Sequence, residues 1–173
     1  MSFCVVTGVG PRTGTSFVMQ KAREVGLPIS GEMFIDGVTI NKHNPNGYWD
    51  INPFHFPTLL QSNKLDNTVV KVWPTVLQFI DISKIKCIVV LERKNKEEQI
   101  SSILKVLNDE LTLPINQIFY DQKTPIELIE ESNNILNYYL KPDINFIKVY
   151  TEDLDSSIKN ILDFLERGLS CQQ

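Results

Sequence analysis

A short segment near the amino terminus gathers the residue types that proteins use to hold phosphate or sulfate. Glycines let the backbone approach an anion closely and adopt positive φ where the chain must turn. An arginine guanidinium grips such a group through two parallel hydrogen bonds, and hydroxyl groups add further donors. All of these occur together in residues 8–16, whose sequence is Gly-Val-Gly-Pro-Arg-Thr-Gly-Thr-Ser. The segment therefore predicts a binding site for an anion.

This segment lacks the lysine of ordinary ATPases and GTPases. Their phosphate loop has two glycines five apart, followed directly by Lys and then by Ser or Thr. Here Gly14 is followed by Thr15, and the basic residue comes earlier, as Arg12. An ordinary nucleoside triphosphatase is therefore disfavoured. A glycine-rich turn that binds nothing is the alternative, but the arginine and hydroxyls crowded into one loop favour a ligand site.

Residues 10–16 resemble the PRSGTS or PKSGTT loop of the sulfotransferases, with Thr13 in place of Ser. In that family the loop binds the 5′-phosphosulfate of 3′-phosphoadenosine 5′-phosphosulfate (PAPS). The resemblance therefore implies a PAPS-dependent sulfotransferase that needs no metal. Phe17 falls where many members carry a tryptophan that stacks on adenine, although a core phenylalanine is an equal alternative. The other implied donor contacts are Gly10, Pro11, Arg12, Thr13, Gly14, Thr15 and Ser16.

A second anion-binding position is implied by the same resemblance. In sulfotransferases an arginine at a strand end and a serine eight residues later together hold the 3′-phosphate. This chain has Arg93 just after the apolar run 87–91, and Ser101 stands at that spacing. Strand ends and the first turns of the following helices meet at the carboxyl edge of a parallel sheet, where α/β proteins bind ligands. The alternatives are a surface ion pair of Arg93 with Glu92 or Glu97 and a solvated Ser101.

Sulfuryl transfer needs cations around the transferred group and a base for the acceptor hydroxyl. Arg12 is the first candidate cation, and Lys71 is the second because many sulfotransferases have a strand-end lysine there. The histidine that follows in the family is replaced by Trp73, which cannot accept a proton. Asp50 is therefore the candidate base, in a segment (residues 44–50) that resembles the NPxGYFE sequence of bacterial sulfotransferases.

Several residues near the predicted site have plainer alternatives. Asp50 is equally compatible with a cap or turn role. His43 and His55, which flank it, are more typical of surface loops. Many eukaryotic sulfotransferases also carry an Arg-Lys-Gly loop over the 3′-phosphate, which this sequence lacks. Lys94 and Lys96 are the candidates to replace it.

The predicted site residues fall between alternating strands and helices. Apolar β-branched runs predict buried parallel strands, and apolar residues at helical spacing predict the helices between them. The expected strands cover residues 3–7, 68–72, 87–91 and 145–150. One expected helix follows Gly14, and others cover 56–61, 97–107, 125–140 and a closing segment that stops at Gly168. A short amphipathic segment around 76–80 separates the second and third strands. This order predicts a three-layer α/β/α fold with a mainly parallel, doubly wound sheet of the P-loop and sulfotransferase type.

Length and composition limit the possible partners. The 173 residues suffice for one core, so a single domain is expected over 1–173, with 31–67 as an irregular lid or binding segment. A net charge of −4 argues against a broad nucleic-acid surface. The three cysteines have no metal-binding spacing, and the first apolar run is too short for a signal or membrane segment. We therefore expect a cytoplasmic protein whose partners are a nucleotide donor and a small-molecule or glycan acceptor, without nucleic acid or membrane.

Two alternatives to a sulfotransferase stay open. A small nucleotide or metabolite kinase with a divergent loop would need a metal-binding carboxylate at a strand end, and Glu92 is the candidate. A catalytically inactive nucleotide-binding module of the same fold would explain Trp73 and the missing Arg-Lys-Gly loop. Binding of adenosine 3′,5′-bisphosphate without magnesium favours the sulfotransferase, whereas magnesium-dependent ATP binding favours the kinase.

Overall fold

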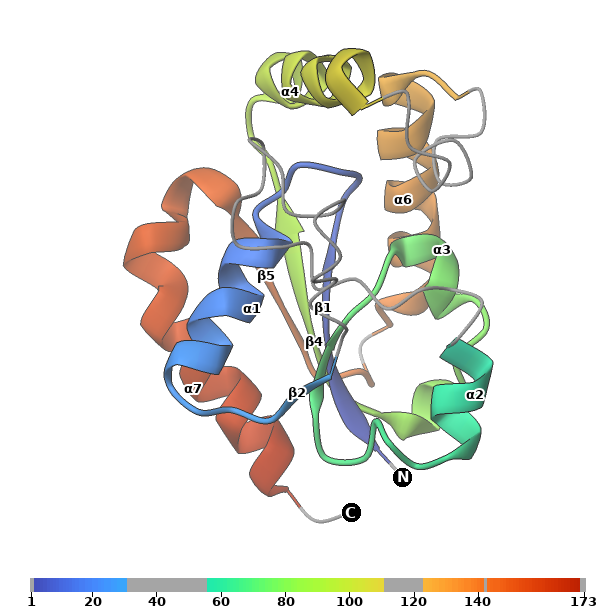
Figure 1. Cartoon of the computed structure of the whole chain (residues 1–173), viewed down its shortest axis with the longest axis vertical. Coiled ribbons are helices and arrows are strands. Elements are labelled where there is room, and N and C mark those ends of the chain that lie inside the picture. The colour runs from blue at the N-terminus through green and yellow to red at the C-terminus, as the bar shows by residue number, and fades with distance from the viewer. Residues whose placement is uncertain (1, 31–55, 111–122, 142, 172–173) are drawn as a thin grey trace.

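Five parallel strands form the central sheet of the computed structural model, which describes residues 2–30, 56–110, 123–141 and 143–171 (Figure 1). The strand order is β2-β3-β1-β4-β5. The strands are β1 (Phe3–Gly8), β2 (Ile29–Ser30), β3 (Val69–Lys71), β4 (Ile85–Glu92) and β5 (Phe146–Tyr150). The predicted α/β fold with a parallel, doubly wound sheet is therefore confirmed. β2, with only two residues, is a strand that the sequence pattern did not predict.

The two central strands are buried on both faces, which explains their continuous apolar sequences. Every residue of β1 is buried, and β4 pairs with it from Cys4 opposite Cys87 to Gly8 opposite Leu91. A strand that is covered by helices on both sides needs apolar side chains in both directions. From β1 the chain goes on to β2, and from β4 to β5, on opposite sides of this central pair. The carboxyl ends of β1 and β4 therefore mark the point where ligands bind in open α/β sheets.

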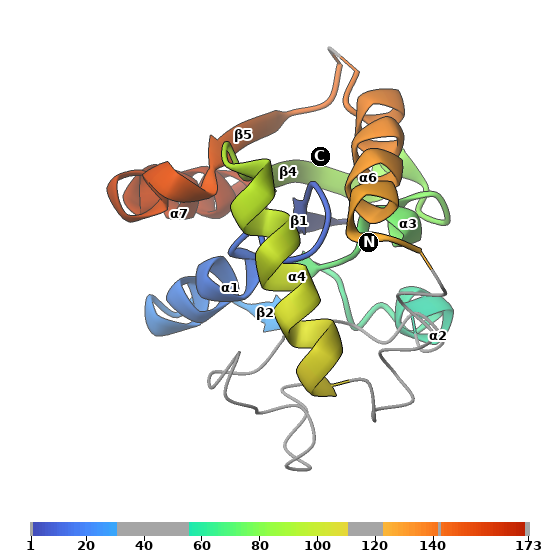
Figure 2. The same cartoon turned by 90° about the horizontal axis from the view of Figure 1, so that it is seen from above.

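Two helical layers cover the sheet (Figures 1 and 2). One core joins the sheet to α1 (Thr15–Glu24) and α7 (Leu154–Ser170). The core on the opposite face joins it to α2 (Phe56–Gln61), α3 (Pro74–Leu77) and α6 (Pro125–Tyr139). Two short 3-10 turns, η1 (Ile82–Lys84) and η2 (Thr151–Asp153), precede β4 and α7. The three-layer arrangement leaves the carboxyl edge of the sheet to the connecting loops.

The helix α4 (Lys96–Glu110) contributes Ile103 to the core that α2, α3 and α6 share. It lies across the carboxyl edge of the sheet, above the ends of β1 and β4 (Figure 2). Its residues Gln99 and Ile103 are fully buried. Glu97 and Glu98 stand in its first turn, where negative charge suits the positive end of the helix dipole. α4 therefore covers the place where the sequence predicts a ligand.

Gly168 does not end the last helix, contrary to the sequence prediction. α7 continues to Ser170, and Gly168 is buried inside it. A Cβ at this position would lie 2.6 Å from Cys87 Sγ and 2.9 Å from Cys4 Sγ. Glycine is therefore required here for the close approach of helix and sheet, and not as a helix stop.

Other predicted elements lie near the expected bounds. Residues 56–61 form α2 as predicted, whereas residues 31–55 of the predicted lid lie outside the described residues. The amphipathic segment expected at 76–80 overlaps α3 only at Val76 and Leu77. α3 begins at Pro74, because proline suits the first turn of a helix, and ends at Leu77. Within the described ranges, every helix is too short or too polar to cross a membrane.

Candidate anion-binding site

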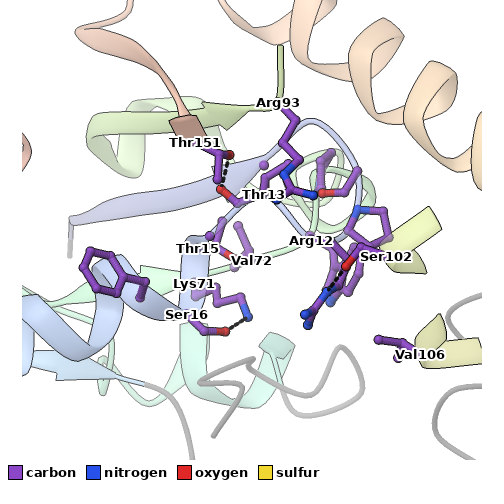
Figure 3. Close-up of a pocket in the computed structure, with 17 residues that line it drawn as sticks. Arg12, Thr13, Thr15, Ser16, Lys71, Val72, Arg93, Ser102, Val106 and Thr151 are labelled. Atoms are coloured by element: carbon purple, nitrogen blue, oxygen red, sulfur yellow. Dashed lines mark hydrogen bonds between the residues drawn. The ribbon is translucent and has the colours of Figure 1, made fainter. Parts of the chain in front are cut away.

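A cavity of about 290 Å³ opens at the carboxyl edge of the sheet (Figure 3). Its walls come from the β1–α1 loop, from the ends of β3, β4 and β5, and from α4. This volume is near the lower end of the range for small-molecule sites. The lining residues are Gly8, residues 10–17, residues 71–74, Arg93, Ser102, Val106 and Thr151.

The backbone of the β1–α1 loop alternates between two conformations. Gly10, Arg12 and Gly14 have positive φ values of 79°, 64° and 86°. The residues between them do not, and the ring of Pro11 fixes its φ near −65°. Alternation of this kind turns backbone N–H groups toward one side, as in the concave nests that bind anions, although Pro11 has no N–H to contribute here. For Arg12 this conformation is strained, and a strained non-glycine residue persists only where its surroundings hold it.

Three carbonyl groups of the loop are held by side chains from other elements. Gln99 Nε2 donates to Val9 O and to Pro11 O, both at 2.8 Å. Thr151 Oγ1 donates to Thr13 O at 2.7 Å. In a trans peptide the carbonyl and the next N–H point in opposite directions. These bonds therefore turn the N–H groups of the next residues, at positions 10, 12 and 14, away from the bracing side chains.

The amino end of α1 adds positive potential to the same place. Its N-cap is Gly14, which has no side chain to cap the helix, and the first turn contains no acidic residue. The first N–H groups of a helix have no acceptor within it, and the helix dipole is positive at this end. Lys71, only 7% exposed, donates from Nζ to Ser16 Oγ at 2.9 Å. A buried cation thus stands beside the helix terminus.

Two arginines, Arg12 and Arg93, add positive charge to the walls of the cavity (Figure 3). Arg12 Nε donates to Ser102 Oγ on α4 at 3.1 Å. Arg93 follows the end of β4, and its buried Nε has no hydrogen-bond partner among the described residues. A buried donor without a partner is costly unless a ligand or water satisfies it. Arg93 also lines the cavity, and its guanidinium group is suited to a second anionic group there.

No carboxylate lines the described walls of the cavity. Glu92, at the end of β4, instead pairs with Lys96 at 3.0 Å and with Lys148. Partial burial acts to raise the pKa of the Glu92 carboxyl, but the hydrogen bonds from Lys148 and Lys96 outweigh it and hold the pKa below its ordinary value. The charged side chains among the described walls of the cavity are therefore all positive, although the chain as a whole carries a net charge of −4.

This arrangement can hold an elongated dianion at two points, the nest of the β1–α1 loop and Arg93. No protein family, curated protein or solved structure matches the chain. What the site does must therefore be inferred from its own chemistry.

Most of the predicted donor-binding residues lie around this one cavity. Residues 10–17, Lys71 and Arg93 all line it. Phe17 lines the cavity and also packs against the core beneath α1 and α7. Its position is therefore compatible with both predicted roles, stacking on adenine and packing in the core. Ser101 does not line the cavity, because it is exposed on α4 while its neighbour Ser102 faces the site. Successive helical residues differ by about 100° in direction, so a shift of one position changes the side that a residue faces.

The remaining candidates are placed elsewhere or lie outside the described residues. Lys94 pairs with Asp153 at 2.7 Å and Lys96 with Glu92, and neither lysine lines the cavity. The predicted base Asp50, with His43 and His55, lies in the segment that the structure does not describe.

Sequence reasoning missed Gln99, Ser102 and Thr151. Thr151 follows a parallel strand directly, so the rule that ligands bind at carboxyl ends of strands is a usable signal for it. Ser102 is adjacent to a residue that was predicted. A buried glutamine inside an otherwise ordinary amphipathic helix gives no such signal, because its partners are carbonyl groups about 90 residues away.

Proposed function

We propose that this chain is a sulfotransferase-like protein that binds PAPS in the cavity at the carboxyl edge. The 5′-phosphosulfate would lie against the nest of residues 10–16, and the 3′-phosphate against Arg93. One observation carries the proposal: a loop with three positive φ values, at Gly10, Arg12 and Gly14, lines a cavity with Lys71 and Arg93, and the described lining residues include no carboxylate. The sequence resemblance of residues 10–16 to the sulfotransferase loop supports the same ligand.

The residues of the site suit sulfuryl transfer. In this reaction the bond between sulfur and the 5′-phosphate oxygen breaks, a bond to the acceptor oxygen forms, and the acceptor loses its proton. Negative charge gathers on the departing phosphate and on the sulfuryl oxygens. The loop N–H groups, Arg12 and Lys71 would stabilise this charge, and preorganised donors of this kind are usually the largest contribution to catalysis in such transfers.

The same charge pattern disfavours the kinase alternative. Phosphoryl transfer from ATP uses magnesium held by carboxylates near the phosphates. The candidate for this role, Glu92, is instead held by Lys96 and Lys148 and does not line the cavity. A donor that carries its charge on phosphate and sulfate groups, without a metal, fits the described walls better.

A second candidate function is a nucleotide-binding module without turnover. Trp73 lines the cavity at the end of β3, where the sulfotransferase pattern has a histidine, and the described walls include no His, Asp or Glu. The described lining side chains therefore include no base that could take the proton from the hydroxyl group of the sulfuryl acceptor. Measurement of PAPS turnover separates the two functions, because they share the ligand but not the chemistry.

Ligand-induced thermal shifts test the proposal directly. A ligand at a hundred times its Kd stabilises the folded state by about 2.7 kcal/mol. We expect adenosine 3′,5′-bisphosphate to raise Tm without magnesium, more than ADP or magnesium ATP does. Arg12→Ala and Arg93→Ala should each reduce the shift. A larger shift with magnesium ATP would favour the kinase and contradict the proposal.

Turnover is measured with PAPS and a panel of phenolic and sugar acceptors. Release of adenosine 3′,5′-bisphosphate that depends on an acceptor supports the transferase. Tight binding of the bisphosphate with no release under any acceptor supports the binding module.

A further inference from the structure

Gln99 connects α4 to the anion-binding loop through a single amide group. Its side chain is completely buried. Its Nε2 donates to the carbonyl oxygens of Val9 and Pro11, at 2.8 Å each, so both amide hydrogens are used on the loop. The sequence separation of 88–90 residues excludes a local turn or cap as the reason for these bonds.

These bonds act on the residues whose backbone forms the nest. The two accepting carbonyls belong to the peptides before Gly10 and Arg12, which are two of the three loop residues with positive φ. Because each peptide is planar and trans, holding its carbonyl also fixes the direction of the following N–H. The strained conformation of Arg12 requires such a restraint.

The chemistry of the Gln99 side chain argues against a purely space-filling role. Its Oε1 is buried without a hydrogen-bond partner among the described residues. A buried acceptor without a partner destabilises the fold, and an apolar side chain of similar size would avoid that loss. The loop also packs tightly here, because a Cβ on Gly10 would lie 2.9 Å from Ile129 Cγ1 and 3.3 Å from Gln99 Nε2. The amide is therefore suited to orienting the loop.

We propose that Gln99 is a positioning residue, which holds the anion-binding loop in its nest conformation before a ligand binds. It contacts the loop backbone and does not line the cavity. The proposal rests on the proposed anion site for its functional meaning, but its structural part can be tested without any nucleotide.

Gln99→Met tests this role because it keeps the side-chain length and removes both donors. Ile103→Val is the matched control, since Ile103 is a fully buried residue of the same helix. We expect the backbone ¹H–¹⁵N resonances of Gly10 and Arg12 to shift in ligand-free Gln99→Met and to stay in place in Ile103→Val. Gly26 is an internal reference, because it has φ 81° and nothing within 4 Å of its Cβ position.

Affinity is then measured by calorimetry with inorganic pyrophosphate and with adenosine 3′,5′-bisphosphate. Gln99→Met should weaken both ligands by about tenfold, a factor that corresponds to about 1.4 kcal/mol. Ile103→Val should bind both as the unchanged protein does. Unmoved loop resonances together with unchanged affinity for both ligands would overturn the proposal.

The outcomes distinguish this proposal from the proposed function. If the unchanged protein binds pyrophosphate but not the bisphosphate, the PAPS assignment fails and the pyrophosphate measurement still judges Gln99. If it binds neither, the resonances alone decide: shifted resonances support the positioning role, and unshifted ones overturn it. Should Gln99→Met fail to fold even with trimethylamine N-oxide while Ile103→Val folds, Gln99 would be a structural residue and the proposal would be wrong.

Discussion

The β1–α1 loop and the contact between α7 and the sheet both depend on glycine, but for different physical reasons. In the loop, Gly10 and Gly14 supply positive φ. In the helix contact, Gly168 supplies only space, beside the thiols of Cys4 and Cys87. The loop region also contains buried polar atoms without hydrogen-bond partners, whereas the contact between α7 and the sheet is formed by apolar side chains and thiols.

The buried polar atoms without hydrogen-bond partners lie near the loop and not near the contact between α7 and the sheet. Within the described part of the chain, the buried side-chain atoms without a hydrogen-bond partner are Thr7 Oγ1, Arg93 Nε and Gln99 Oε1. Thr7 directly precedes the loop, Arg93 lines the cavity, and Gln99 braces the loop. Strain and missing partners at one place, within an otherwise well-packed fold, are typical of a functional site.

Of the substitutions that test this difference between the two regions, Gly10→Ala in the loop should have the largest effect, on ligand affinity. Gly10→Ala combines positive φ with a Cβ that would lie 2.9 Å from Ile129 Cγ1, so the nest should deform. We expect adenosine 3′,5′-bisphosphate to bind on the order of a hundredfold more weakly, which corresponds to about 2.7 kcal/mol. Calorimetry measures this. Gly26→Ala has the same backbone strain in open space and should leave the affinity unchanged, and an equal loss in both variants would contradict the role of the nest.

Substitutions of Arg12 separate the effect of its charge on ligand affinity from the effect of its strained backbone on stability. Arg12→Ala and Arg12→Gly both remove the guanidinium, and each should weaken bisphosphate binding by roughly thirtyfold, as expected for a charge-assisted contact of about 2 kcal/mol. Only glycine also relieves the φ of 64°, so Arg12→Gly should be more stable than Arg12→Ala by about 1 kcal/mol. Urea denaturation compares the two. Equal stability would mean that the loop relaxes when the arginine is removed.

Gly168→Ala should show the opposite pattern, lower stability with unchanged ligand affinity. Its new Cβ would crowd Cys87 Sγ at 2.6 Å, and overpacking of this kind costs about 1–3 kcal/mol. Adding Cys87→Ala should recover part of the loss because it removes the sulfur. A Gly168→Ala variant that loses ligand affinity without losing stability would show that the two regions are coupled.

The smallest effect concerns pH. Glu92 has a pKa below its ordinary value of 4.5, so its contribution to stability is present above that value and is lost as the pH falls through the folded-state pKa. Glu92→Gln should therefore lower stability at neutral pH by less than about 1 kcal/mol and reduce the further loss of stability below pH 4.5. Denaturation at neutral and acidic pH measures this. Glu130→Gln, a change of equal charge at an exposed position of α6, is the control and should lower stability at neutral pH less than Glu92→Gln does. An equal loss in both variants would contradict the role of the ion pairs.

The sequence predicted features that depend on neighbouring residues and missed those that depend on distant ones. The strand–loop–helix of residues 3–24 was predictable because apolar runs, glycines and hydroxyls follow one another locally. Gly168 was misassigned because helix stops and close helix contacts both favour glycine, and only the packed thiols distinguish them. Ser101 was chosen over Ser102 because a motif spacing does not fix the rotation of a helix. Gln99 could not be recognised, since its partners are backbone atoms of another segment.

The position of α4 across the carboxyl edge has a consequence for local opening. Gln99 and Ser102, two residues that hold the loop, both come from this helix and lie 88–90 positions along the chain from their partners. Whenever α4 detaches, the loop loses these restraints together, so an anion bound to the loop must also oppose detachment of the helix. Among the described side chains of α4, Ser102 and Val106 line the cavity. Slower hydrogen exchange at the amides of the whole helix should therefore report that the loop is occupied.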